Sequence, residues 1–367
     1  MKGLYIHIPF CLKKCKYCDF TSFVGMEAFF ESYVQELTKE MRQYKGDKID
    51  SIFIGGGTPS ILNAGQLKII TDYIYNNFDV AADAEFTLES NPGTLTDEKL
   101  RMFREAGINR LSIGVQSFND LELIKIGRIH TAKEAAEAIL AARKNGFSNI
   151  NIDLMFSLPG QTRESLIKTL ETALSLNPEH ISCYSLILEE DTPLYDEVKK
   201  GVLYLPEEEE DRELYTLACE ILSNHGYQQY EISNFSKKGY ECRHNLKYWD
   251  CEEYIGVGIA AHSYYKEERY FNTDSFEKYM KGEYTEEKTG KLSEEDKIKE
   301  FIIMGLRKTE GISREEFFKR FKKDFSKLYE TEINKFKKLK LLEEKDGFIR
   351  LTFEGINLSN SVLCEFV

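Results

Sequence analysis

Three cysteines near the start of the chain are the residues best suited to carry chemistry. Cys11, Cys15 and Cys18 stand in a C-x-x-x-C-x-x-C spacing within "LYIHIPFCLKKCKYCDF". Thiolates are the usual ligands of iron–sulfur clusters, and three of them can hold three irons of a [4Fe–4S] cubane. The fourth iron then stays open to bind and reduce another molecule. A Cys₃His zinc site with His7 is the alternative, but His7 lies on an expected strand and no fourth cysteine follows at a finger-like distance.

The first 230 residues alternate between strand and helix patterns. Short apolar runs predict strands at 4–8, 51–55, 85–89, 110–115, 149–156 and 180–188, and periodic segments between them predict helices at 26–44, 64–78, 95–107, 131–146 and 162–176. Six strands with helical crossovers indicate an α/β fold with a parallel sheet, either doubly wound or curled into a partial (β/α)6 barrel. Right-handed crossovers that wind steadily in one direction place the helices on one face, which favours the barrel.

The remaining residues predict two further units. Residues 231–293 are polar, rich in aromatic residues and irregular, and they are expected to form a connecting segment. Residues 294–367 predict three helices, followed by two short strands about a Lys-Asp-Gly turn. That pattern is typical of a smaller, winged-helix-like domain. Its charges are mixed in sign, which favours an accessory role over DNA binding.

Composition limits the classes of function. The chain has 367 residues and a formal net charge of −13, which argues against a general binder of nucleic acid or anionic membranes. No stretch approaches the roughly 18 apolar residues of a membrane-spanning helix, and the start does not read as a signal peptide. The expected location is therefore the cytoplasm, where scattered cysteines stay reduced. The others, expected to be free thiols, are Cys183, Cys219, Cys242, Cys251 and Cys364.

Polar residues and glycines follow successive predicted strands, the edge at which such folds carry their chemistry. "GGGTPS" (55–60) lets a ligand approach the backbone closely, or it forms a tight turn between strand and helix. Each of these residues is weak evidence alone, but their order along successive strands is not. The candidates from these segments are Gly56, Gly57, Thr58, Glu89, Gln116, Arg128 and Asp153.

The cysteine spacing, with Tyr17 just before the last cysteine, resembles the radical S-adenosylmethionine (SAM) superfamily. The set "YIHIPFC", "GGGTP", "ESNPG", "GVQSF" and "NIDLMFSLPGQT" is similar to the oxygen-independent coproporphyrinogen III oxidase group, over nearly the whole chain. The resemblance implies a partial barrel of radical SAM type, a [4Fe–4S] cluster on the three cysteines, and one or two SAM molecules. It implies SAM contacts at Tyr5, Tyr17, Gly56, Gly57, Thr58, Glu89, Gln116, Arg128 and Asp153.

Three departures place the chain nearer to the heme chaperone branch of that group. The oxidases have a further cysteine where this chain has Phe20, and they carry a segment before the first strand, whereas this chain starts at the strand. The third is "HNLKYW" (244–249), which fits the H-N-x-x-Y-W motif of the chaperone branch. The implied heme candidates are His244, Asn245, Tyr248 and Trp249.

Histidine is a common axial ligand of heme, and aromatic side chains can cover a macrocycle face. The alternative for this motif is a packed, hydrogen-bonded corner. Cys242 and Cys251 flank it as weaker candidates for a thiolate ligand, and His262 either lines the same cavity or belongs to the core.

The leading hypothesis is therefore a heme chaperone that carries a cluster and SAM and passes heme to an acceptor protein. The implied partners are heme and that acceptor, with no nucleic acid, membrane contact only through the acceptor, and a monomeric or dimeric state. The first alternative is an oxygen-independent coproporphyrinogen III oxidase, which removes propionate carboxyl groups by radical chemistry. A structural zinc protein or a winged-helix regulator is the remaining class.

Overall fold

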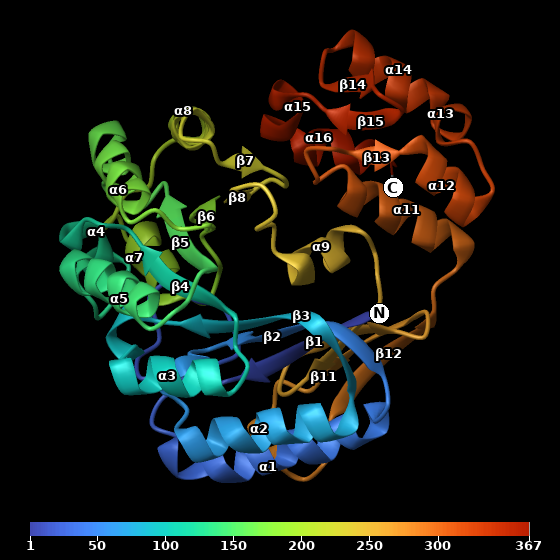
Figure 1. Ribbon diagram of the computed structural model, residues 1–367. Helices are drawn as coiled ribbons and strands as arrows, with labels where there is room; N and C mark the ends of the chain where they lie inside the picture. Colours follow the sequence, from blue (N-terminus) through green and yellow to red (C-terminus); the bar gives the residue numbers. More distant parts are fainter. Residues whose placement is uncertain (367) are drawn as a thin grey trace.

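The computed structural model describes residues 1–366, and its main element is one twelve-stranded sheet (Figure 1). The strand order is β12-β11-β10-β9-β1-β2-β3-β4-β5-β6-β8-β7, and β1 to β6 run parallel in chain order. These six strands are β1 (Lys2–Ile8), β2 (Lys48–Gly56), β3 (Asp79–Ser90), β4 (Arg110–Gln116), β5 (Ile150–Phe156) and β6 (His180–Ser185). The predicted α/β fold is confirmed; the sheet is mixed and open, as in a partial barrel, rather than closed.

Helices connect the parallel strands. They are α1 (Phe30–Glu40), α2 (Ala64–Asn77), α3 (Asp97–Glu105), α4 (Asp120–Lys125), α5 (Ala132–Lys144) and α6 (Arg163–Ser175). Two further helices, α7 (Pro193–Lys199) and α8 (Glu208–Asn224), follow β6. Short 3-10 helices occur at Glu27–Phe29, Met41–Tyr44, Pro59–Ile61, Pro92–Thr94 and Cys364–Phe366. Capping boxes begin α2, α5 and α6, where the side chains of Asn63, Thr131 and Thr162 accept hydrogen bonds from backbone N–H groups. The sequence thus specifies where these crossovers start.

The main core lies between the sheet and these helices. Every residue of β4 is buried, and β1, β2 and β5 contribute isoleucine and leucine side chains that are fully buried. Strands that are covered on both faces are expected to be almost continuously apolar. For this reason the short apolar runs of the sequence predict these strands correctly. Figure 1 shows α1 and α2 on one side of the sheet and the short helix α9 (Arg243–Trp249) on the other.

Residues 231–293 differ from the expected irregular connection, because much of the segment is built into the sheet. It contains β8 (Asn234–Ser236), α9, β9 (Tyr254–Val257), β10 (His262–Tyr265), β11 (Glu268–Asn272), α10 (Phe276–Met280) and β12 (Thr285–Lys291), with β7 (Gln228–Gln229) just before it. Strand β9 pairs in parallel with β1, and β10 to β12 extend that edge antiparallel. These strands are short and partly exposed, so they lack the apolar runs that reveal a central strand.

The C-terminal domain has its own core and a three-stranded sheet in the order β13-β15-β14. Its elements are α11 (Glu294–Gly305), β13 (Ile312–Ser313), α12 (Arg314–Phe321), α13 (Phe325–Leu328), α14 (Glu330–Lys338), β14 (Leu342–Lys345), β15 (Phe348–Leu351), α15 (Phe353–Asn357) and α16 (Ser359–Leu363). This order agrees with the predicted winged-helix-like unit, but four helices rather than three precede the β14–β15 hairpin, and the strand β13 and the helices α15 and α16 are additional. Within residues 1–366, no helix has both the length and the apolar character needed to cross a bilayer.

Candidate functional site

A cavity of about 530 Å³ lies at the carboxyl ends of the parallel strands. Its walls include the cysteine loop after β1, the glycine segment after β2 and residues at the ends of β3 to β6. Every predicted cluster and SAM residue except Tyr5 lines it: Cys11, Cys15, Cys18, Tyr17, Gly56, Gly57, Thr58, Glu89, Gln116, Arg128 and Asp153. The structure therefore brings together eleven residues that span more than 140 positions of the chain.

The three cysteines are free thiols, partly buried, in a loop that the backbone holds in place. The N–H of Cys11 donates to the carbonyl oxygen of Phe23 (2.9 Å), and the N–H of Cys18 donates to that of Cys15 (3.3 Å). Two sulfur atoms also accept hydrogen bonds from side chains: Thr58 Oγ1 lies 3.6 Å from Cys11 Sγ, and Arg128 Nη1 lies 3.4 Å from Cys15 Sγ. Such donors stabilise thiolates, the form that binds iron.

His7 does not join the cysteines as a fourth ligand in this arrangement. Its Nδ1 lies 3.0 Å from the Tyr5 hydroxyl and its Nε2 lies 3.0 Å from the carbonyl oxygen of Thr21. Both ring nitrogens are thus occupied by hydrogen bonds within the protein. The donor set facing the cavity is therefore three sulfur atoms, which fits a cubane with one open iron better than a Cys₃His zinc site.

The glycine segment at the end of β2 packs so closely against the chain around His7 and Phe10 that larger side chains would clash there. A Cβ on Gly57 would lie 2.6 Å from the carbonyl oxygen of Phe10, and Gly56 has a φ of +105° with its Cβ position 2.5 Å from the His7 ring. The N–H groups of Gly56, Gly57 and Thr58 all donate within the protein. This segment therefore offers acceptors rather than donors, which suits an ammonium group.

Arg128 lies at the centre of the polar wall. Its Nη2 donates to Asn91 Oδ1 (2.6 Å) and to the carbonyl oxygen of Gly114, and its Nη1 donates to Cys15 Sγ. Its Nε is buried and has no hydrogen-bond partner within residues 1–366. Arg128 also lines the cavity, and a guanidinium binds carboxylates strongly. The residues present thus fit both the cluster and SAM.

Glu89 and Asp153 place two partly buried carboxyl groups on the wall of the cavity. Ser112 Oγ donates to Asp153 Oδ2 (3.1 Å), and Asn151 Nδ2 donates to Asp153 Oδ1 (2.7 Å). Burial raises the pKa of Asp153, and burial together with the charge of Asp153 raises the pKa of Glu89 to about 8. The N–H of Gly56, 3.0 Å from Glu89 Oε2, opposes that shift only in part. Glu89 is therefore poised to gain a proton, or a cationic ligand.

The raised pKa of Glu89 predicts a pH-dependent stability in protein free of iron and SAM. The pKa rises on folding from its ordinary value of 4.5 to about 8. Protonation of Glu89 therefore stabilises the folded protein fully below pH 4.5. This stabilisation is lost as the pH rises through about 8, and the free energy of unfolding falls by up to about 1.4 kcal/mol per pH unit. The Glu89→Gln variant should lack this loss, whereas Glu98→Gln, an exposed control, should keep it. Urea unfolding from pH 5 to 8 measures the difference, and parallel profiles for all three proteins would refute the assignment.

Below the main cavity, a smaller one of about 240 Å³ reaches into the barrel interior. Glu89, Ser112, Asp153 and Ser182 line both, so the two spaces adjoin. Tyr5, the one predicted SAM contact outside the main cavity, lines this lower space together with residues of α9. The structure thus places Tyr5 one layer deeper than the other predicted contacts.

The heme candidates on α9 are split between this interior and the surface. Asn245 and Tyr248 line the lower cavity, as does His244, whose side chain is buried. His244 Nδ1 lies 3.0 Å from Ser51 Oγ, and its Nε2 lies 2.8 Å from the Tyr248 hydroxyl. Burial lowers the pKa of His244 to about 3, so the ring is neutral. In this conformation His244 has the geometry of a packed, hydrogen-bonded corner.

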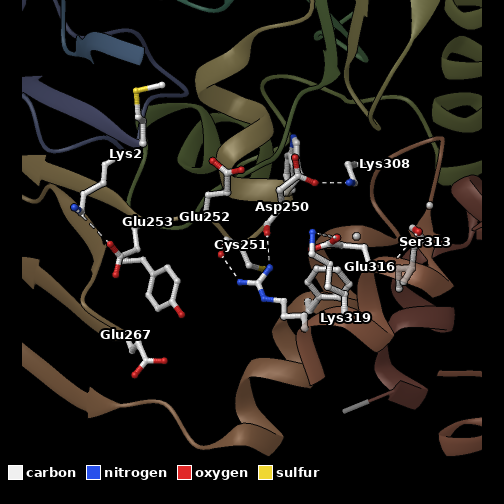
Figure 2. A pocket seen from close by; sticks show the side chains of 18 of the residues that line it. Lys2, Asp250, Cys251, Glu252, Glu253, Glu267, Lys308, Ser313, Glu316 and Lys319 are labelled. Atoms are coloured by element: carbon white, nitrogen blue, oxygen red, sulfur yellow. Dashed lines mark hydrogen bonds and ion pairs between the residues drawn. The ribbon is translucent and has the colours of Figure 1, made fainter. Parts of the chain in front are cut away.

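Trp249 lies at the other end of α9 and faces a cleft of about 980 Å³ between the barrel and the C-terminal domain. Figure 2 shows that cleft, with Lys2 directed toward Glu253 on one side and Asp250 toward Lys308 on the other. The cleft is therefore lined largely by charges that are already paired.

The three weaker heme candidates, Cys242, Cys251 and His262, lie in different places in the structure. Cys251 borders the cleft, and burial raises the pKa of its thiol to about 11. Cys242 is fully buried, its thiol lies 3.5 Å from Glu85 Oε1, and burial raises its pKa to about 12. His262 is exposed on β10 and stacks on Phe271, so it lies neither in the core nor in the cavity beside His244. None of the three presents a thiolate or imidazole to the barrel interior.

Comparison with known proteins agrees with this site. The profile of the Radical SAM superfamily matches residues 5–173, and that of the HemN C-terminal domain matches residues 292–358. The "Heme chaperone HemW" of Bacillus subtilis is 40% identical over 377 aligned residues, covering 100% of this chain and 99% of that protein. This chain belongs to the HemW family. A second HemW, from Lactococcus lactis, is 39% identical and covers 99% of this chain and 96% of its own length.

The solved structure of coproporphyrinogen III oxidase (HemN) from Escherichia coli has the same fold, with a TM-score of 0.86. The likeness covers 99% of this chain and 89% of that one at 24% sequence identity, so it shows the fold alone. Together these findings confirm the predicted resemblance to the oxidase group and its HemW branch. Radical SAM membership implies a [4Fe–4S] cluster and SAM.

Several functional side chains were not singled out from the sequence. Asn91 links Arg128 to the Thr58 hydroxyl (3.0 Å), and its only signal was its place in "ESNPG". Tyr184 donates to Gln116 Oε1 (3.1 Å). Ser112 and Ser182 join the two cavities, yet serines at strand ends carry no distinctive pattern. These residues can be recognised as part of the site only from the arrangement of the strands in the fold.

Proposed function

We propose that this protein is a heme chaperone that holds a [4Fe–4S] cluster on Cys11, Cys15 and Cys18 and binds SAM in the cavity beside it. The supporting observation is the 39–40% identity, over nearly the full length, to two proteins named heme chaperone. Phe20 supports the same branch, because the oxidase group has a cysteine at that position. The cargo is heme, and the recipient is an acceptor protein.

The residues of the site have distinct roles in this proposal. A cluster with an open iron supplies an electron and a coordination position for the amino and carboxylate groups of SAM. Thr58 and Arg128 donate hydrogen bonds to the sulfurs of Cys11 and Cys15, and Arg128 also lines the cavity in which the SAM carboxylate binds. Glu89 and the glycine segment accept hydrogen bonds from the amino group of SAM. Tyr17, Gln116 and Asp153 shape the remainder of the SAM pocket, and Tyr5 closes it from below.

A heme contact at residues 244–249 stays a prediction. His244 has both ring nitrogens engaged, so iron ligation requires one of these two hydrogen bonds to break. Trp249, at the interdomain cleft, is the member of the motif that a ligand reaches without such a change. The division of the chain at residues 230 and 293 is likewise a proposal.

Two assays on anaerobically reconstituted protein test the function. Hemin titration should show saturable binding of about one heme per chain, with release to a heme-free globin. Incubation with coproporphyrinogen III, SAM and a reductant should yield no protoporphyrinogen. Robust formation of that product would instead identify a coproporphyrinogen III oxidase. Weak, non-saturating hemin binding would refute the chaperone proposal.

A further inference from the structure

A chain of hydrogen bonds connects the SAM cavity with the start of α9 through His180 and Tyr230, which have no role in the assignments above. Asn151 Nδ2 donates to Asp153 Oδ1 (2.7 Å), and Asn151 Oδ1 lies 2.6 Å from His180 Nδ1. His180 Nε2 lies 2.8 Å from the Tyr230 hydroxyl, which accepts from the N–H of Cys242 (3.2 Å). Cys242 is the N-cap of α9. These groups thus link a predicted SAM contact to the helix that carries the heme candidates.

The strands of the barrel bring these groups together. Asn151 and His180 are paired neighbours on β5 and β6, and Asp153 lies two residues further along β5, so the three side chains point to the same face of the sheet. That face is the barrel interior, because Asn151 and Asp153 line the lower cavity. The side chains of Asn151 and His180 are buried. A buried polar chain of this kind is stable only when its donors and acceptors are matched.

The direction of each hydrogen bond follows from the partners. The N–H of Ser182 donates to Asn151 Oδ1 (3.1 Å), so this atom is the oxygen of the amide. His180 Nδ1 must therefore carry the ring proton, and its Nε2 accepts from the Tyr230 hydroxyl. Burial and the positive charge of Arg110 lower the pKa of His180 well below its usual value, so the ring carries no second proton. All the donors of the chain thus point from α9 toward the SAM cavity.

We infer that His180 and Tyr230 are positioning residues that couple the occupancy of the SAM cavity to the start of α9. Both oxygens of Asp153 accept hydrogen bonds, from Asn151 and Ser112, which suits an ionised carboxylate. An ionised carboxylate only accepts, so a SAM group that contacts Asp153 donates to it and competes with the amide of Asn151. Because consecutive hydrogen bonds strengthen one another, this competition also weakens the bonds at His180 and Tyr230. Bound SAM thus loosens the start of α9, and by reciprocity a change at α9 alters the affinity for SAM.

The first turn of α9 has a second attachment, which is independent of this chain of hydrogen bonds. The carboxylate of Glu85 accepts from the N–H groups of Arg243 and His244 at 3.1 Å. Glu85 is not among the described residues that line the SAM cavity. It therefore keeps the helix in place when the N–H of Cys242 is released, and the coupling is a local change at the start of the helix. The coupling rests on the SAM site of the proposed function but does not require bound heme.

Hydrogen exchange of cluster-loaded protein, measured by mass spectrometry with and without saturating SAM, tests the coupling. In the unmodified protein, SAM should speed amide exchange in peptides that cover residues 242–249 by about fivefold or more. Tyr230→Phe removes only the hydroxyl and should abolish this response. His180→Asn should abolish it too, because the shorter amide replaces the Nδ1 donor but does not reach Tyr230. Tyr227→Phe is the matched control and should respond like the unmodified protein, because it removes a buried hydroxyl that donates to the carbonyl oxygen of Pro178 (2.6 Å) outside the chain of hydrogen bonds.

The outcomes separate the coupling from the proposed function. Iron content and SAM affinity are measured for each variant, so that exchange is compared at equal occupancy. Exchange that SAM leaves unchanged or slows in the unmodified protein overturns the coupling, and so does an undiminished response in Tyr230→Phe, which keeps the aromatic ring and tests the coupling even where His180→Asn unfolds. Both results leave the chaperone proposal intact. Failure of the unmodified protein to bind SAM would instead refute the SAM site, and the coupling with it.

Discussion

Replacing Cys15 by alanine should abolish the iron–sulfur cluster. The unmodified protein, reconstituted anaerobically, should contain about four irons and four sulfides per chain and show a broad brown absorption. Cys15 Sγ is the sulfur that Arg128 contacts at 3.4 Å, and it faces the cavity with Cys11 and Cys18. Two thiolates leave two irons without a protein ligand, so the variant should retain little or no iron. Iron and sulfide analysis with the visible spectrum measures this loss.

Cys364 supplies the matched control. It is an exposed free cysteine near the end of the C-terminal domain, so Cys364→Ala removes one thiol without touching the cavity. Its iron and sulfide content should equal that of the unmodified protein. One zinc and no sulfide in the unmodified protein would refute the cluster assignment, as would a full cluster in Cys15→Ala. Circular dichroism should show that both variants are folded.

Replacing Arg128 by glutamine should weaken SAM binding by about 100-fold. Arg128 lines the cavity, and the proposed ligand of that cavity carries a carboxylate that its guanidinium can bind. A charge-assisted hydrogen bond in such a site contributes about 1.5–3 kcal/mol, which corresponds to about ten- to 100-fold in affinity. The upper end applies because the loss of the charge also releases Asn91 from its 2.6 Å contact. Equilibrium dialysis with SAM measures the change.

The control for Arg128 is Arg101→Gln, which removes an exposed guanidinium on α3. Because Arg128 also contacts Cys15, iron content must be measured first, and SAM affinity compared at equal cluster occupancy. A variant that binds SAM as tightly as the unmodified protein would show that Arg128 serves only the cysteine loop. Loss of SAM binding in Arg101→Gln would show that the assay reports a general disturbance.

The sequence predicts the central strands well because each is a buried, nearly continuous apolar run between helices with clear caps. It fails at the edge of the sheet. Strand β12 reads "TEEKTGK" and is largely exposed, so neither its composition nor its alternation marks it as a strand. Its position depends on pairing with β11, a contact that no local pattern encodes. Tyr329, which separates α13 from α14, is a similar case, because the sequence of residues 326–342 predicts one continuous helix.

For the site, the motifs identify which residues meet at the strand ends, since parallel strands align their carboxyl ends whatever the loops do. The motifs do not indicate how far into the barrel each of these residues lies. Tyr5 and Glu89 each stand next to buried isoleucine or leucine on their strands, yet Glu89 lines both cavities and Tyr5 lines only the lower one. The burial of His244 depends on Glu85, whose carboxylate accepts from the N–H groups of Arg243 and His244 at 3.1 Å. That contact joins residues almost 160 positions apart.

The short helix α9 has a consequence for how the molecule unfolds. Its His244 end is fixed inside the barrel, while Lys308 pairs with Asp250 and Arg320 donates to the carbonyl oxygens of Asp250 and Cys251 at the other end. Melting the C-terminal domain therefore frees one end of a helix whose other end closes the barrel interior. The two hydrophobic cores are separate, but α9 has contacts with both parts of the chain, so we expect it to couple their unfolding.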